Sequence, residues 1–159
     1  MAARPILLYG FEALSFMKIV ASILNAHPSG AASEADSLAL VLEALARCEQ
    51  VCLLCADACL EEESMEKLRS CIRLNFDCAA ICSVTAQLLV RRTEIPGTLV
   101  HAQLHACVIA CQSCADLCAT HASYHHHCEI CTNTCRDCQE QCNRLIGDFP
   151  PSGIIQFQQ

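Results

Sequence analysis

Apolar and cysteine residues recur at alternating steps of three and four along four long stretches of this chain of 159 residues. Side chains at that spacing lie on one face of an α-helix, so each stretch predicts a helix with one core-facing stripe. Polar or helix-breaking runs separate the stretches, among them EEES at 61–64 and the pair Pro96 and Gly97. The predicted helices cover about residues 34–60, 65–90, 98–121 and 124–146.

The four predicted stripes have the periodicity of helices that pack together in a bundle. Because the connections between them are short, neighbouring helices are expected to be antiparallel. We therefore predict an all-α fold, an antiparallel up-down four-helix bundle. The stripes consist of Leu38, Val41, Leu45, Cys48, Cys52, Cys55 and Cys59; Leu68, Cys71, Asn75, Cys78, Cys82, Thr85 and Leu89; Val100, Leu104, Cys107, Cys111, Cys114, Cys118 and His121; and Tyr124, Cys128, Cys131, Cys135, Cys138, Cys142 and Leu145.

Antiparallel packing sorts these stripe residues into two chemically different ends. The leucine and valine residues of the stripes are expected to gather at one end and to close it. The remaining length of the bundle axis is then lined with sulfur and opens near a group of histidines. That open end is expected to hold Cys59, Cys71, Cys118, Cys128, His121 and the histidines at 125–127.

Residues 5–26 form a further apolar stretch, which Glu12 and Lys18 interrupt. The stretch predicts an additional amphipathic helix lying on the bundle, in preference to an export signal, which needs an unbroken apolar run. The same charges argue against a membrane span. Ser33 and Ser64 are predicted to cap the helices that follow them. The expected organisation is an N-terminal amphipathic helix and linker at 1–30, the cysteine-lined bundle at 31–147 and a C-terminal tail at 148–159.

Composition excludes several classes of function. The net charge is −7, and acidic and basic residues are mixed along the chain, so no basic stripe predicts a nucleic-acid partner. Aromatic residues are scarce, with no Trp and two Tyr, which argues against a base-stacking or sugar-binding platform. No glycine-rich phosphate loop, HExxH motif or distinct nucleophile–histidine pair is present. We therefore expect neither an enzyme nor a membrane protein.

The 16 cysteines are the dominant chemical feature of the chain. A disulfide framework usually joins distant segments and needs many turns, whereas these cysteines lie on helical stripes in a chain with few turn residues. Reduced thiols fit this spacing better, and they indicate the cytoplasm, where the glutathione pool keeps thiols reduced. Cysteine alone also fills a core poorly, so the stripes indicate that something else occupies the space between the helices.

A soft metal ion is the expected occupant of that space. Thiolates select Cu(I), Zn(II) and iron–sulfur clusters, but zinc favours closed tetrahedral sites and neither common iron–sulfur spacing occurs as a complete run. Cu(I) tolerates two or three sulfur ligands that bridge neighbouring ions, so a continuous array suits many ions, on the order of one per cysteine. The candidate ligands are Cys48, Cys52, Cys55, Cys59, Cys71, Asn75, Cys78, Cys82, Cys107, Cys111, Cys114, Cys118, His121, His125, Cys128, Cys131, Cys135, Cys138 and Cys142.

The three candidates that are not cysteines admit two interpretations each. Asn75 occupies a stripe position where a cysteine is expected, either as an oxygen ligand or as a polar residue that fixes the helix register. His121 and His125 lie four residues apart at the open end, where imidazoles would meet incoming copper, although exposed histidines at a helix junction are often bystanders. His127, directly before Cys128, is expected to point off the stripe.

The segments CADAC (55–59), CIRLNFDCAAIC (71–82) and HASYHHHCEIC (121–131) resemble the bacterial copper storage proteins of the cytosolic class. The resemblance covers about residues 26–147 and implies a four-helix bundle whose core cysteines bind Cu(I). It also implies that the positions of Asn75, His121 and His125 lie where Cu(I) enters, and that the chain forms a homotetramer. Val41 and Leu45 stand where the family carries further cysteines, which implies fewer ions and a longer apolar plug.

The sequence therefore predicts a non-enzymatic store for multiple Cu(I) ions, which would exchange copper with donor and acceptor molecules. Two alternatives stay open at this point. A thiol-based redox buffer or oxidoreductase would respond to oxidants rather than to copper, through disulfides between neighbouring helices. A zinc or iron–sulfur domain would hold only a few ions in tetrahedral sites.

Overall fold

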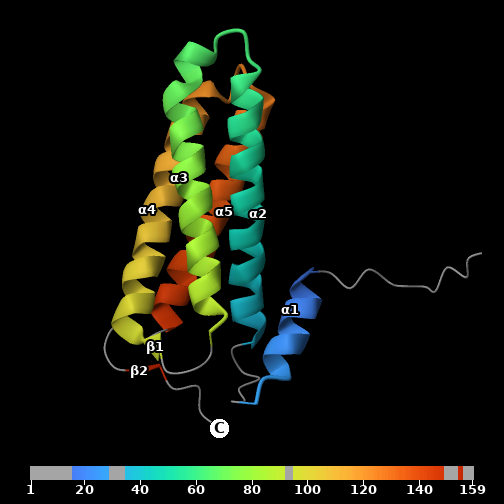
Figure 1. The fold of residues 1–159 in the computed structure, drawn as a ribbon, viewed down its shortest axis with the longest axis vertical. Helices are drawn as coiled ribbons and strands as arrows, with labels where there is room; N and C mark the ends of the chain where they lie inside the picture. Colours follow the sequence, from blue (N-terminus) through green and yellow to red (C-terminus); the bar gives the residue numbers. More distant parts are fainter. Residues whose placement is uncertain (1–15, 29–34, 92–94, 149–153, 156–159) are drawn as a thin grey trace, which may run out of the picture.

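The computed structural model describes residues 16–28, 35–91, 95–148 and 154–155. Four long helices run side by side, and a shorter helix lies against one end of the bundle (Figure 1). Within these residues the elements are α1 (Phe16–Asn25), α2 (Ala35–Leu60), α3 (Met65–Leu89), β1 (Ile95–Pro96), α4 (Gly97–His121), α5 (His126–Asp148) and β2 (Ile154–Ile155).

The long helices form a square bundle in chain order. Helix α2 packs against α3 and α5, and α4 likewise packs against α3 and α5, so every helix has two neighbours. Each connection reverses the chain direction, as Figure 1 shows. The prediction of an antiparallel up-down four-helix bundle with an additional N-terminal helix is confirmed.

The helix boundaries agree with the predicted ranges to within about two residues, but two details of the prediction are wrong. Ser64 occupies the N-cap position of α3, yet its side chain makes no capping hydrogen bond, and its carbonyl accepts one from the Lys67 backbone instead. Tyr124 is 85% exposed rather than part of the core. It lies in the turn between α4 and α5, where the helical periodicity that predicted its burial no longer applies.

One end of the bundle has an apolar core, and we call it the closed end. Leu45 and Leu104 are fully buried there, where α2 and α4 begin. The short strands β1 and β2 pair antiparallel beside it, with Ile95 opposite Ile155 and Pro96 opposite Ile154 (Figure 1). The predicted apolar residues buried at this end are Leu38, Val41, Leu45, Leu89, Val100, Leu104 and Leu145.

Helix α1 packs against α2 near the closed end through the buried side chain of Leu24. A cavity of about 420 Å³ lies between α1 and the bundle, with Val20, Leu42 and Ala86 in its wall. The predicted amphipathic helix began at residue 5, and its first eleven residues, like Ser33, lie outside the described part of the chain. Among the described residues, no helix is both long and apolar enough to cross a membrane.

Candidate metal centre

All 16 cysteines are buried in the structure, each with at most 2% of its surface exposed. All are free thiols, and they come from the facing stripes of α2, α3, α4 and α5. The alternating steps of three and four residues explain the burial, because this spacing places each cysteine on the helix face that points toward the bundle axis. The structure therefore brings together every cysteine that the sequence proposed for the core.

The sulfur atoms lie close to one another across the helices. The Sγ atom of Cys48 lies 3.7 Å from that of Cys135 and 3.9 Å from that of Cys78. Cys52 and Cys135 approach to 3.5 Å, and Cys71 and Cys118 approach to 3.2 Å. Such distances bring thiols from different helices near enough to bind the same metal ion.

The thiols form overlapping groups in which all ligand atoms lie within 4.8 Å of one another. Cys48, Cys52 and Cys135 each belong to two of the four-sulfur groups, so neighbouring groups share ligands. Three of these groups are therefore joined through shared sulfur atoms, and Asn75 contacts both Cys131 of these groups and Cys118 of a fourth. The four-sulfur groups include Cys48, Cys82, Cys111 and Cys138; Cys48, Cys52, Cys78 and Cys135; Cys52, Cys114, Cys131 and Cys135; and Cys55, Cys71, Cys118 and Cys128.

Hydrogen bonding lowers the pKa of some of these thiols and raises the pKa of others, whereas burial raises it. Hydrogen bonds from Cys118 and Cys128 lower the pKa of the Cys71 thiol to about 7. Burial is the largest influence on Cys59 and raises its pKa. Because the thiols hydrogen-bond to one another, protons lie between neighbouring sulfur atoms. Metal binding releases such protons, because only the thiolate is a good ligand.

Asn75 is fully buried and lies between thiols. Its Nδ2 donates to the Cys71 carbonyl at 3.0 Å and also faces the Cys71 sulfur at 3.5 Å. Its Oδ1 accepts a hydrogen bond from Cys131 at 3.0 Å and from Cys114 at 3.4 Å. The amide oxygen therefore faces sulfur in the interior, while the contact with the Cys71 carbonyl fixes the side chain on its own helix.

The end opposite the closed end, where α2 meets α3 and α4 meets α5, carries the histidines, and we call it the histidine end. His127 approaches the sulfur array most closely of these, with Nδ1 3.5 Å from Cys55 Sγ and 3.5 Å from Cys128 Sγ. With Cys59 these residues form a group of three thiols and one imidazole. The expectation that His127 points off the stripe is wrong.

The sequence held a signal that could have identified His127. The residue lies four positions before Cys131 and one before Cys128, so it shares a helix face with Cys131 at the start of α5. The alternating three-and-four spacing by itself passes through Cys128, although two adjacent positions can flank a core-facing stripe at its end.

Within the part of the chain that the structure describes, no other histidine at the histidine end makes a hydrogen bond to sulfur. His125 Nδ1 is 2.9 Å from Glu62 Oε1, and its ring centroid is 5.4 Å from that of His127. His121 is half-buried, and its backbone carbonyl accepts hydrogen bonds from the backbone N–H groups of Tyr124 and His125. Among the described residues, its side chain makes no hydrogen bond or ion pair. His126 is exposed and pairs with Glu129.

Thr85 ends the sulfur array toward the closed end. Its hydroxyl is fully buried, donates to the Ile81 carbonyl at 2.7 Å and accepts from Gln103 Nε2 at 2.9 Å. Beyond it, the stripe continues with Leu89 on α3. The sulfur array is therefore bounded by hydroxyl and aliphatic groups at one end and by imidazoles at the other.

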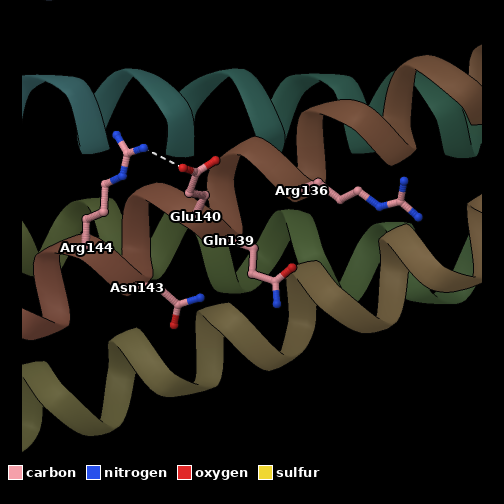
Figure 2. A pocket seen from close by; sticks show the side chains of 5 residues that line it. All are labelled: Arg136, Gln139, Glu140, Asn143 and Arg144. Atoms are coloured by element: carbon pink, nitrogen blue, oxygen red, sulfur yellow. Dashed lines mark hydrogen bonds and ion pairs between the residues drawn. The ribbon is translucent and has the colours of Figure 1, made fainter.

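A second pocket lies on the outer surface of α5 (Figure 2). It has a volume of about 480 Å³, and polar side chains line it, with an ion pair between Arg144 and Glu140. Its wall contains neither thiol nor imidazole, so it is chemically unlike the sulfur array. The lining residues are Arg136, Gln139, Glu140, Asn143 and Arg144.

Comparison with known proteins agrees with this geometry. The model of the family described as copper storage protein matches residues 34–147. An uncharacterized cysteine-rich protein of Bacillus subtilis (strain 168), YhjQ, is 33% identical over 104 residues, which is 65% of this chain and 91% of that protein.

Solved structures from Streptomyces lividans are similar as well. The copper storage protein Ccsp loaded with 10 copper equivalents superposes with a TM-score of 0.77 at 38% identity, over 80% of this chain and 98% of that one. A cytosolic copper storage protein from the same organism, described with five coppers, has a TM-score of 0.70 at 41% identity, over 70% of this chain and 93% of that one.

Proposed function

The chain belongs to the copper storage protein family, and from that premise we propose that it holds many Cu(I) ions on the thiolates of its core. The observation that carries the proposal is the array of 16 buried, free thiols, in which three of the four-sulfur groups share members. A bridged array lets one sulfur serve two ions, so the capacity is on the order of 16 ions per chain. Copper is the cargo of this protein rather than a cofactor for catalysis.

The chemistry of the core supports the monovalent ion. Thiolate is a soft ligand and selects Cu(I) among the copper oxidation states. Each thiolate formed on loading carries one negative charge, and each Cu(I) brings one positive charge. Bridging therefore keeps the buried core close to neutral, which a low-dielectric interior requires. Zinc would favour closed four-thiolate sites, and the sharing of ligands between groups argues against that occupancy.

We propose the 19 residues predicted from the sequence as the metal-binding set, with His127 as a further ligand through Nδ1. The approach of His127 to Cys55 and Cys128 supports this addition. His125 and His121 would line the path by which Cu(I) enters the sulfur array at the histidine end. Residues 31–147 would form the storage unit, to which residues 1–30 and 148–159 are additions outside the metal array.

An uncharged surface supports the proposal that several copies assemble into a homotetramer. Residues 78–90 and 97–115 contain no Asp, Glu, Lys or Arg, in a chain that is 17% charged. On the outer faces of α3 and α4, Val84, Leu99 and Ile109 are 51%, 49% and 63% exposed. Exposed apolar side chains on a face without charged residues are typical of a protein interface. The description of the Streptomyces relative as cytosolic supports storage in the cytoplasm, with copper donors and acceptors as partners.

An anaerobic titration with Cu(I), in competition with a chromophoric chelator, tests the proposed function. We expect the reduced protein to withdraw on the order of 16 equivalents before the chelator complex accumulates. Saturation at about two to four equivalents would instead indicate a small number of discrete sites. A protein that ignores copper but forms disulfides between helices on mild oxidation would be a redox buffer.

A further inference from the structure

Glu62 links two histidines at the histidine end of the bundle. It lies on the connection between α2 and α3, and its Oε1 is 2.9 Å from His125 Nδ1 and 3.1 Å from His127 Nε2. Hydrogen bonds from His127 and then from His125 lower the pKa of the Glu62 carboxyl. The carboxylate therefore accepts two N–H hydrogen bonds, one from His125 just before α5 and one from His127 in its first turn.

The two nitrogens of His127 have different surroundings. Nε2 faces the Glu62 carboxylate, which accepts hydrogen bonds but donates none. Nδ1 faces the sulfur atoms of Cys55 and Cys128. A neutral imidazole has one N–H, and the hydrogen bond at one nitrogen decides which nitrogen keeps a lone pair. With Nε2–H directed to Glu62, the lone pair of Nδ1 is directed to the sulfur array.

We propose that Glu62 is a positioning residue that holds His127 in the tautomer and orientation in which Nδ1 faces incoming copper. The inference rests on the proposed storage function and adds a residue that contacts no thiol in the structure. A carboxylate that accepts the second N–H of a metal-binding histidine fixes the ring and raises its basicity, and its loss typically weakens metal binding about 10- to 100-fold.

The chain supplies matched controls for this test. Glu61 and Glu63 flank Glu62 on the same connection, and both are exposed. Glu61→Ala and Glu63→Ala remove the same charge as Glu62→Ala but leave the contacts of His127 unchanged. Glu62→Gln keeps an amide oxygen that accepts hydrogen bonds but removes the charge, so it separates the hydrogen bond from the charge.

The first measurement uses the reduced, copper-free protein. Ring ¹⁵N chemical shifts of His127, assigned with a His127→Gln variant, report the tautomer at a pH above the titration range of imidazole. We expect the Nε2–H form in the wild type and in both control variants, a mixture in Glu62→Ala, and recovery in Glu62→Gln. An unchanged tautomer in Glu62→Ala, with the same thermal midpoint as the wild type, would overturn the proposal.

The second measurement is the rate at which a chromophoric Cu(I) chelate transfers copper to the protein. We expect Glu62→Ala to slow the transfer about tenfold, with the final number of bound ions unchanged. A loss of capacity in Glu62→Ala without a change of rate would assign Glu62 to the structure of the store and overturn the positioning role. If the wild type binds only a few ions, the storage function fails, while the ¹⁵N measurement still decides the role of Glu62.

Discussion

The histidine end and the closed end of the bundle share one architecture and differ in the groups that their core-facing residues present. At the histidine end, thiols and imidazole approach one another within 3.5 Å, as Cys55 and His127 do. At the closed end, the same helical positions carry Leu45 and Leu104, and both are fully buried. The alternating three-and-four spacing therefore sets the fold, whereas the side chains placed at those positions set what the interior can bind.

The largest expected effect comes from copper itself. Loading should stabilise the sulfur-lined length of the bundle, because an ion that binds only the folded state lowers the free energy of that state. Hydrogen exchange should therefore slow strongly in α3 and α5 near Cys71 and Cys128, and little around Leu45. Chelation should reverse the effect. Equal protection at both ends would show that the closed end also takes part in binding.

The second prediction sets Leu104→Ala against Cys111→Ala, two substitutions on the stripe of α4. Leu104→Ala should cost about 3 kcal/mol of unfolding free energy, because it leaves a cavity in the apolar core. Its copper capacity should stay at the wild-type value. Cys111→Ala should cost less, about 1 kcal/mol, but lower the capacity by about one ion. Denaturant unfolding and the chelator titration measure the two effects. An equal loss of copper capacity in both variants would contradict the prediction that only the sulfur-lined length of the bundle binds copper.

A third substitution would move the boundary between the two ends. Leu45 lies one helical turn before Cys48, so Leu45→Cys, alone or with Val41→Cys, should extend the sulfur array toward the closed end. We expect about one additional ion for each added thiol. Leu38→Cys, closer to the start of α2, is the control for a thiol added away from the array. Unchanged stoichiometry in Leu45→Cys would place the limit of the store at Cys48.

The smallest expected effect is the response of the histidine end to acid. The pKa of Glu62 is lowered from 4.5 by its hydrogen bonds to His127 and His125. Its contribution to stability is therefore complete above 4.5 and is lost as the pH falls through the lower value of the folded state. Thermal midpoints below pH 4.5 should depend less steeply on pH in Glu62→Gln than in the wild type. Glu61→Gln, an exposed neighbour, should retain the wild-type slope.

The regular helices were predictable, because their stripes depend on local spacing alone. Each cysteine reached the core as predicted, since a helix carries its periodicity without reference to the rest of the chain. The positions of Tyr124 and Ser64 were not predictable in this way, because both lie at helix boundaries where the backbone leaves the helical path.

The contact between Glu62, which lies between α2 and α3, and His127 at the start of α5 could not be predicted from the sequence for a different reason. Glu62 and His127 are 65 positions apart, and each looks like an ordinary surface residue in its own segment. Their proximity depends on the lengths of α2, α3, α4 and α5 together. A change of one residue in any of these helices would rotate one partner by about 100° around its axis. Local patterns therefore predicted the buried thiols of the interior better than the contact between Glu62 and His127.

The buried side chains of Leu45 and Leu104 close one end of the sulfur array, so copper ions would enter and leave at the histidine end. Ions that arrive early would travel deepest by exchange between shared sulfurs, and later arrivals would remain near His127. We therefore expect withdrawal to follow the reverse of arrival, last in and first out. Sequential loading with the two stable copper isotopes, followed by partial chelation, would reveal this order. Random isotope release would show that the ions mix inside the bundle faster than they leave it.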